Sequence, residues 1–253
     1  MAERYYWPSD QTQGSAVKSG TMAELAELFG DEAHHLTRVM RQKPGDRVTL
    51  FDGDGHEFLA EITDLRKYRV LLRLLEVRDV DTESPRQVTM VVSLPKGDRQ
   101  KWLVEKLTEL GCHRLIPLQT ERGVAQCSDQ VIERLRRQVI EATKQCNRTR
   151  LMQVTHEQTI ADCVADHGHG DPVAGWIAHP RSDGDFGQHQ LSELMQPPLP
   201  KRVLGLIGPE GGFTQQEVEQ AVTLGLRPLD LGPRILRVET AAMMLTAIMT
   251  VKT

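Results

Sequence analysis

The sequence predicts an α/β fold in which a small β-rich domain precedes a larger domain of alternating strands and helices. From residue 88 onward, short apolar runs alternate with helical stretches, which is typical of a parallel sheet covered by helices. Before residue 80, apolar runs alternate in period two and are separated by turn residues, which is typical of paired strands. Residues 79–87 are polar and contain a proline. We therefore expect two domains, 1–80 and 81–253.

The first domain is expected to be a small β-barrel. Residues 48–51 and 57–62 lie on either side of an Asp-Gly-Asp-Gly turn, so they predict a hairpin. Residues 70–75 predict a further strand, and residues 23–28 and 33–39 look like short helical pieces. A small closed barrel would bury such strands without leaving an exposed edge.

The second domain is expected to alternate between strands and helices. Its strands are predicted at residues 88–94, 114–118, 173–179 and 203–207. Its helices are predicted at residues 98–110, 129–146, 215–225 and 239–250, and loops at 162–170 and 182–187. The apolar stripe of the second helix is Val131, Leu135, Val139 and Ala142. The last helix is apolar nearly all round, which core burial and a subunit interface would both produce.

The composition is that of an ordinary globular protein. Of its 253 residues, 39% are hydrophobic and 26% are charged. No signal-peptide core or long apolar span is present, and the four cysteines form no Cys-x-x-Cys pair, so we expect a cytoplasmic protein without a membrane segment. The formal net charge of −4 argues against a general nucleic-acid binder. Residues 96–150 nevertheless contain twelve lysines and arginines against seven acidic residues, which suits either a local RNA footprint or solvated helices.

Two glycine-containing segments near the C-terminus indicate a ligand site. Residues 203–214 form an apolar strand, a Gly-Pro-Glu-Gly-Gly turn and a helix start, at which Thr214 and Glu217 predict a capping box. Residues 229–242 form a Gly-Pro turn, an arginine-flanked apolar pair and another helix start. Glycine lets bare backbone approach a ligand, although a plain tight turn would use the same residues. Neither a Walker loop nor a Gly-x-Gly-x-x-Gly pattern is present.

These segments resemble a known family. GPEGGF at residues 208–213 and LGPRILRVETA at residues 231–241 are similar to the C-terminal signature of the RsmE family, bacterial methyltransferases of the SPOUT superfamily. Further matching motifs follow in the family's order: HLTRVMR at 35–41, PGD at 44–46, KGDR at 96–99, ELG at 109–111 and EATKQC at 141–146. The resemblance covers nearly the whole chain. It departs at Asn147, where the family commonly has glycine, and asparagine is the residue best able to take the positive φ of a glycine.

The resemblance implies a fold and an activity. Members of the family methylate N3 of a uridine in 16S ribosomal RNA of the small ribosomal subunit, with S-adenosylmethionine as the cofactor. The implied fold is a PUA-like β-barrel that grips RNA, followed by a SPOUT domain with a deep trefoil knot. The implied assembly is a homodimer in which the partner completes the active site. No metal is required, because the sulfonium is already a good leaving group.

Three other functions stay open as alternatives. A related SPOUT methyltransferase would act on another position of ribosomal or transfer RNA. A non-catalytic, RNA-binding assembly factor would keep the fold, but it would not need both glycine-containing segments. A nucleotide-dependent oxidoreductase is disfavoured by the missing dinucleotide fingerprint.

The resemblance assigns S-adenosylmethionine to three loops at the carboxyl edge of the sheet, where ligands bind in open α/β folds. Mostly backbone groups are expected to meet the adenine ring, because its edge needs N–H and C=O partners. The residues expected to bind the cofactor are His179, Ile207, Gly208, Glu210, Gly211, Gly212, Leu231, Gly232, Ile235, Leu236, Arg237, Thr240 and Ala241.

Arg237 and Glu239 are the expected catalytic residues. An arginine near the carbonyl oxygens of uracil would stabilise the uracil anion, as an oxyanion hole does. Glu239 would accept the N3 proton as a general base. Both residues also have a purely structural explanation, in which Glu239 complements the helix dipole and Arg237 caps a neighbouring loop.

Four arginines are expected to contact RNA. Arg4 stands beside two tyrosines and a tryptophan that would stack a flipped-out base, although the same segment would also serve as a strand that anchors the barrel. Arg38 and Arg41 are expected to lie one helical turn apart, where their side chains would contact phosphates or stay solvated. The full set is Arg4, Arg38, Arg41 and Arg148.

Overall fold

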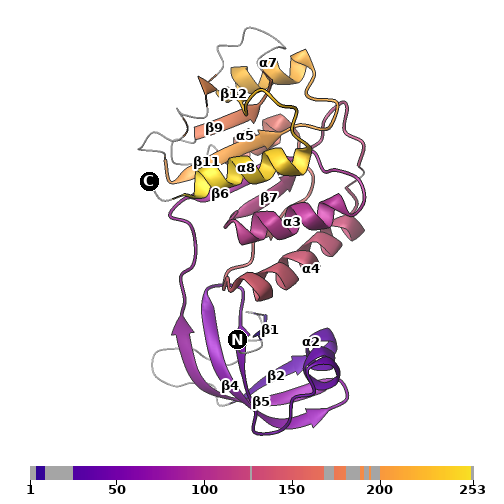
Figure 1. The fold of residues 1–253 in the computed structure, drawn as a ribbon, viewed down its shortest axis with the longest axis vertical. Coiled ribbons are helices and arrows are strands. Elements are labelled where there is room, and N and C mark those ends of the chain that lie inside the picture. The colour runs from indigo at the N-terminus through magenta and orange to yellow at the C-terminus, as the bar shows by residue number, and fades with distance from the viewer. Residues whose placement is uncertain are drawn as a thin grey trace. The chain divides into compact units, whose positions relative to one another are not determined.

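The computed structural model describes residues 4–8, 25–125, 127–167, 174–180, 189–190, 194 and 200–251. Contacts between Cα atoms divide the chain into two compact units (Figure 1). The first unit comprises Met1–Glu83 and Thr143–Leu151, and the second comprises Ser84–Ala142 and Met152–Thr253. The chain therefore returns once to the first unit, with a nine-residue segment that no sequence pattern indicated.

The first unit contains a five-stranded sheet in the order β1-β3-β4-β5-β2. β1 runs parallel to β3, and the other pairs are antiparallel. The predicted hairpin is confirmed in β3 and β4, joined by the Asp-Gly-Asp-Gly turn. Within the described residues the sheet is open, with β1 and β2 at its edges. The strands are β1 (Arg4–Tyr6), β2 (Leu25–Phe29), β3 (Arg47–Phe51), β4 (His56–Arg66) and β5 (Arg69–Asp79).

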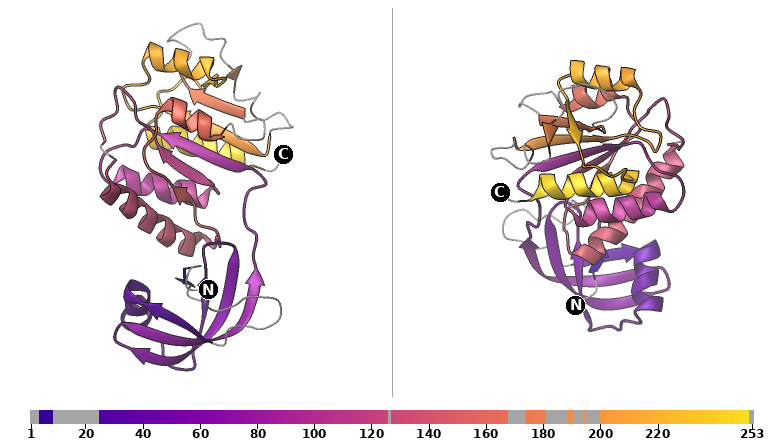
Figure 2. Two further views of the ribbon diagram at one scale, coloured as in Figure 1. Left: turned by 180° about the vertical axis from the view of Figure 1, so that it is seen from behind. Right: turned by 45° about the horizontal axis from the view of Figure 1, so that its top comes forward.

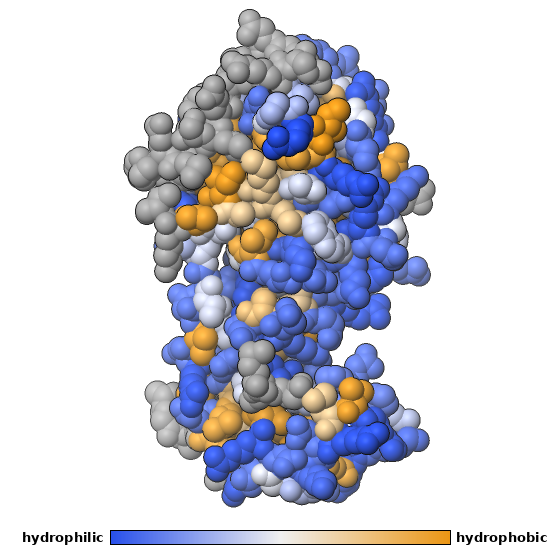
Figure 3. All heavy atoms as spheres, viewed as in Figure 1, coloured by the Kyte–Doolittle hydropathy of each residue, from blue (hydrophilic) through white to orange (hydrophobic). Residues whose placement is uncertain are grey.

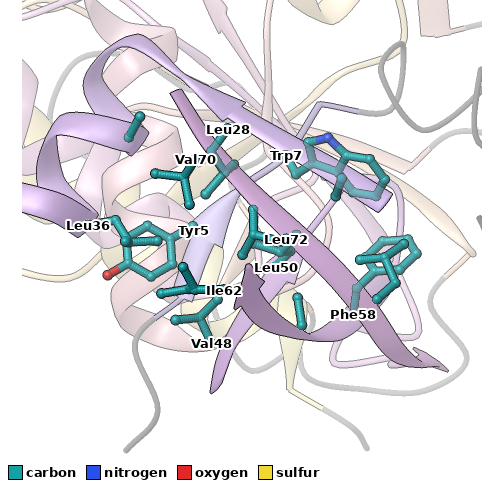
Figure 4. Packing of buried hydrophobic residues seen from close by; sticks show 14 residues of the cluster. Tyr5, Trp7, Leu28, Leu36, Val48, Leu50, Phe58, Ile62, Val70 and Leu72 are labelled. Carbon is teal, nitrogen blue, oxygen red and sulfur yellow. The ribbon is translucent and has the colours of Figure 1, made fainter. Parts of the chain in front are cut away.

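One apolar core holds the first unit together (Figure 4). Alternate residues of the strands point inward because successive side chains of a strand face opposite sides of the sheet. Val48 and Leu50 of β3 and Val70 and Leu72 of β5 follow this rule and are fully buried. Leu36 closes the core from the π-helix η1 (His35–Val39), which continues the short helix α2 (Gly30–His34).

The helical prediction for residues 23–28 is wrong where the structure describes it. Leu25–Phe29 is strand β2, which pairs antiparallel with β5. Ala26 and Leu28 are buried while Leu25 and Phe29 are exposed, so burial follows the strand period of two. Leu-Ala-Glu-Leu is a good helix-forming sequence, and here pairing with the sheet overrides that weak local preference.

The second unit contains a seven-stranded sheet in the order β10-β12-β9-β11-β6-β7-β8, and every strand pair is parallel. Its strands are β6 (Gln87–Val92), β7 (Arg114–Pro117), β8 (Gln153–Val154), β9 (Ala174–Ala178), β10 (His189–Gln190), β11 (Arg202–Ile207) and β12 (Arg227–Asp230). Its helices in the described residues are α3 (Arg99–Glu109), α4 (Asp129–Cys146), α5 (Ile160–His167), α7 (Gln215–Thr223) and α8 (Val238–Thr250), and the last four residues of α4 belong to the first unit. The predicted α/β alternation is confirmed.

Helices cover both faces of this sheet (Figure 2). On one face, Leu204 and Leu206 of β11 join a buried cluster that includes residues of α5 and α7. On the other face, a Cβ on Gly205 would meet Cδ2 of Leu245 at 2.7 Å, so glycine is required for the close packing of α8 on β11. α3 packs beside α8 on this second face.

Helix α8 is buried along one side and half-exposed along the other. Ala242, Leu245 and Met249 are buried, whereas Met243, Met244, Ala247 and Ile248 are half-exposed. Figure 3 views this face and shows apolar residues over α8, with hydrophilic residues to the right of them and below. No helix in the described part of the chain has the length and apolar character that crossing a membrane requires.

Several predicted boundaries need correction. Residues 162–167 were predicted as loop but belong to α5, an amphipathic helix that buries Ile160 and Cys163. The buried stripe of α4 contains Ile132 in place of the half-buried Val131. β12 was not predicted, because its four residues include a proline and are too short for a periodic pattern. The loops predicted at 168–170 and 182–187 lie outside the described residues.

Candidate active site

The carboxyl ends of three neighbouring strands carry the predicted cofactor loops. β12, β9 and β11 are adjacent in the sheet, and Ala178 lies beside Leu229 while Ile177 lies beside Leu206. The backbone N–H of His179 donates to the carbonyl of Leu229 at 3.1 Å, so the loops after β9 and β12 start side by side. The structure therefore brings together the starts of the loops that follow the three strands, at the edge where ligands bind in such sheets.

The Gly-Pro-Glu-Gly-Gly turn after β11 is built tightly. A Cβ on Gly208 would meet the ring of Phe213 at 2.9 Å, so this position has room for glycine alone. The capping box is confirmed: the Thr214 side chain accepts from the N–H of Glu217, and the Glu217 carboxylate accepts from the N–H of Thr214. Arg122 donates to the carbonyl of Gly211 at 2.8 Å. These contacts hold the turn at the start of α7.

The loop after β12 is open to solvent. Gly232 has a φ of +107°, nothing lies within 4 Å of the place where its Cβ would be, and its N–H donates to the carboxylate of Asp230 at 2.9 Å. Ile235 is 100% exposed, although isoleucine is normally among the most buried residue types. An accessible backbone beside an uncovered apolar side chain fits a loop that meets a ligand. Gly212 is likewise open, with nothing within 4 Å of its missing Cβ.

A hollow of about 560 Å³ lies beside these loops, between α3 and the start of α8. Its volume falls within the range of roughly 300–1,000 Å³ that small-molecule sites occupy. Three of the predicted residues meet here, namely Arg237, Glu239 and Thr240. The remaining lining residues come from the start of α3 and were not predicted: Asp98, Arg99, Lys101, Trp102 and Glu105. The KGDR motif at residues 96–99 was a sequence signal for Asp98 and Arg99, and no motif pointed to Lys101, Trp102 or Glu105.

Glu239 is a buried carboxylate at the hollow. It is 6% exposed, and its Oε2 atom has no hydrogen-bond partner. Nη1 of Arg99 lies 3.7 Å from this oxygen, while Nη2 of the same guanidinium donates to Oε1 of Glu210 at 2.7 Å. Arg99 thus links the glycine turn after β11 to the first turn of α8. A buried carboxylate oxygen without a hydrogen bond is costly, and the Oε2 atom of Glu239 is such an oxygen.

Arg38 and Arg41 are exposed on the first unit. They do not sit on one helix as predicted: η1 ends at Val39, and Arg41 has a φ of +53°. A positive φ is uncommon for arginine, and it turns the chain after the helix. Both side chains remain available to phosphates.

Arg4 and Arg148 are buried in the first unit. Arg4 donates to Glu57 at 2.6 Å and to the carbonyls of Thr143 and Arg148, and it lies over the ring of Phe51. Arg148 forms an ion pair with Glu83. Asn147 has a φ of 61°, a positive value as expected at a position where the family commonly has glycine. Arg4 of β1 therefore holds residues 143–151 against the sheet, and Arg148 ties the same residues to Glu83. Contact of either side chain with RNA stays a prediction.

Family relationships match this architecture. The RNA methyltransferase domain family matches residues 82–250, and the RNA methyltransferase PUA domain family matches residues 29–75. The ribosomal RNA small subunit methyltransferase E of Bacillus subtilis is 33% identical over 87% of this chain and 87% of its own length. That of Synechocystis is 33% identical over 83% of this chain and 67% of its own length.

Solved structures agree with the sequence relatives. A methyltransferase of Legionella pneumophila, in complex with its bound cofactor S-adenosylmethionine, has a TM-score of 0.82 at 29% identity and covers 98% of this chain and 97% of its own. A ribosomal RNA small subunit methyltransferase E of Neisseria gonorrhoeae, bound to S-adenosylmethionine, has a TM-score of 0.81 at 28% identity over 98% and 97% of the two chains.

A parallel α/β sheet with open loops at its carboxyl edge, preceded by a PUA domain, defines an RNA methyltransferase that uses S-adenosylmethionine. The chain belongs to the ribosomal RNA small subunit methyltransferase E family. The prediction of the family, of the enzymatic activity and of the cofactor is therefore confirmed.

Proposed function

We propose that this enzyme methylates N3 of a uridine in the 16S ribosomal RNA of the small ribosomal subunit. The observation that carries this assignment is the hollow beside the carboxyl edge of the sheet, with Arg237 and the buried carboxylate of Glu239 on its wall. The names of the relatives point to the small-subunit RNA as the substrate.

S-adenosylmethionine supplies a methyl group from its sulfonium when bound. We assign its binding to the loops after β9, β11 and β12. The loop residues that would hold it are His179, Ile207, Gly208, Glu210, Gly211, Gly212, Leu231, Gly232, Ile235 and Leu236. The open backbone of Gly212 and Gly232 and the uncovered side chain of Ile235 fit this assignment. Ala241 is buried in the first turn of α8 and would contribute by positioning that turn.

The chemistry of uracil explains the two charged residues of the hollow. The N3–H is a weak acid, and its proton must leave before N3 can form a bond to carbon. The carboxylate of Glu239, which lines the hollow and has one oxygen without a hydrogen bond, would accept that proton. Arg237 would stabilise the negative charge that develops on the uracil oxygens. Contacts with Glu239 and Arg237 would also hold the uracil ring in place for the methyl transfer.

RNA binding by the first unit is assigned to its exposed cations. Arg38 and Arg41 face solvent, whereas Arg4 and Arg148 are occupied by internal partners. Neutralisation of phosphates by lysine and arginine supplies most non-specific affinity for RNA. We therefore propose that, of the four predicted arginines, mainly Arg38 and Arg41 contact RNA phosphates.

The homodimer is the second part of the proposal. Its support is the half-exposed apolar face of α8, formed by Met243, Met244, Ala247 and Ile248 (Figure 3). A second copy of the chain would cover this face, and the first turn of α8 carries Glu239, so the interface would reach the active site.

The trefoil knot of the SPOUT fold is proposed as well. It is supported by the sheet order, in which β9 lies between the two later strands β11 and β12.

The activity is tested by methyl transfer to defined RNA. Purified enzyme is incubated with tritiated S-adenosylmethionine and small ribosomal subunits from a strain that lacks the corresponding gene, and the label is mapped by nuclease digestion and chromatography. We expect label in 3-methyluridine at one position of the 16S RNA. Label in another base, in transfer RNA, or in no RNA would contradict the proposal. Sedimentation equilibrium gives the mass of the assembly and tests the dimer.

A further inference from the structure

Trp102 has an exposure that is unusual for tryptophan. It lies on the outer side of α3 and is 39% exposed, whereas the other two tryptophans of the chain, Trp7 and Trp176, are buried. Among the described residues of the second unit, it is the only exposed phenylalanine, tyrosine or tryptophan. A large aromatic side chain contributes most to stability when it is buried, so its position at the surface suggests contact with a ligand.

Trp102 belongs to one face of α3. Asp98, Lys101, Trp102 and Glu105 follow the spacing i, i+3, i+4 and i+7, so their side chains lie along a single stripe of the helix. The opposite stripe is buried and includes Leu103 and Leu107. All four residues of the outer stripe line the hollow, across from the start of α8. The indole therefore shares one cavity with Glu239.

This pairing has the chemistry that an unstacked pyrimidine requires. Bases that leave a nucleic-acid stack are commonly held on the face of an aromatic side chain and read by hydrogen bonds along their edges. Glu239 offers an acceptor without a donor, which matches an N–H group on the edge of the base. Lys101 and Arg237 line the same hollow and supply positive charge for oxygen atoms of the substrate.

We propose that Trp102 is the stacking platform for the extruded uracil and determines how tightly the target nucleotide is held. The indole holds the face of the ring while Glu239 meets its N3 edge. This inference rests on the proposed methylation of uridine N3. It assigns to the residue a role in nucleotide binding, and it assigns none in proton transfer or in binding of S-adenosylmethionine.

The test compares Trp102→Leu with Trp102→Phe in the methyl-transfer assay on small ribosomal subunits. Loss of one aromatic–base stack weakens binding by about fivefold to 150-fold. We expect Trp102→Leu to raise KM for the RNA substrate by about tenfold or more, with a smaller change in kcat, and Trp102→Phe to recover most of the loss. The substrate should also quench the tryptophan fluorescence of the wild type and leave that of Trp102→Leu unchanged, since the remaining tryptophans are buried.

Three controls separate this role from others. Leu224→Ala removes an apolar side chain of nearly equal exposure, 38%, outside the hollow, and it should leave KM unchanged. Calorimetry of S-adenosylmethionine binding and sedimentation of the assembly should give wild-type values for Trp102→Leu. If the variant changed the assembly mass, or if KM stayed the same, the stacking role would be wrong. If the wild type itself transferred no methyl group to uridine, the proposed function would fail instead.

Discussion

The two units use buried charge in different ways. In the first unit, the guanidinium of Arg148 is buried against Glu83, and the terminal nitrogens of the buried Arg4 donate to Glu57 and two carbonyls, so both cations have hydrogen-bonded partners inside the fold. In the second unit, the buried carboxylate of Glu239 keeps one oxygen without a hydrogen bond, beside an open hollow. Hydrogen-bonded ion pairs hold a chain segment in place, whereas the Glu239 carboxylate has only the longer ion pair with Arg99 at this oxygen, at 3.7 Å, and lines a hollow that a ligand could enter.

Arg148→Met should give the largest effect and should act on stability alone. The substitution leaves the carboxylate of Glu83 without its partner, and removal of one partner from a buried ion pair costs about 3–5 kcal/mol. Urea unfolding followed by circular dichroism measures this free energy. Arg137→Met, at an exposed position of α4, is the matched control and should change it by less than about 0.5 kcal/mol. Equal stability combined with weak RNA binding would instead make Arg148 an RNA contact.

Arg237→Ala should lower the activity and leave the stability unchanged. Arg237 is exposed at the start of α8, so its removal should leave the free energy of unfolding within about 0.5 kcal/mol of the wild type. Loss of a donor that stabilises a developing anion lowers kcat by about 10²–10³-fold. Single-turnover methyl transfer measures the rate, and calorimetry should show unchanged affinity for S-adenosylmethionine. Full activity would remove Arg237 from the mechanism.

Gly211→Val tests the cofactor loop and should have a smaller effect. A Cβ at this position would meet only Arg122, at 3.4 Å, so the turn can keep its shape. The added side chain would stand where the backbone is expected to approach the cofactor. We expect S-adenosylmethionine to bind roughly tenfold or more weakly, which is about 1.4 kcal/mol, while the melting temperature stays the same. An unchanged dissociation constant would place the cofactor away from this turn.

The difference between the two units marks the limit of what the sequence predicts. The GPEGGF and LGPRILRVETA segments identify the family, and the helical period placed α4 at its observed bounds. The sequence also led to the prediction that Arg4 and Arg148 contact RNA, but it did not show that both side chains are buried. Burial of an arginine depends on partners far along the chain, such as Glu83 for Arg148, and no local pattern carries that information. Trp102 was missed for the converse reason, because an aromatic residue in an amphipathic helix is expected to face the core.

The last expected effect is spread over the pH scale and concerns a buried histidine that the second unit keeps neutral. Burial lowers the pKa of His167 to about 4, with Arg202 and Arg114 adding to the shift. The unfolded chain therefore binds more protons than the native state between pH 4 and about pH 6.5. The stability associated with His167 is complete above pH 6.5 and is lost as the pH falls toward 4.

Urea unfolding across this range measures the slope of the free energy of unfolding against pH. His167→Gln should reduce this slope, by less than the ~1.4 kcal/mol per pH unit of one fully titrating group. His156→Gln, at an exposed position, is the control and should leave this slope unchanged. If both variants reduced the slope equally, burial of His167 would not be the cause of the pH dependence.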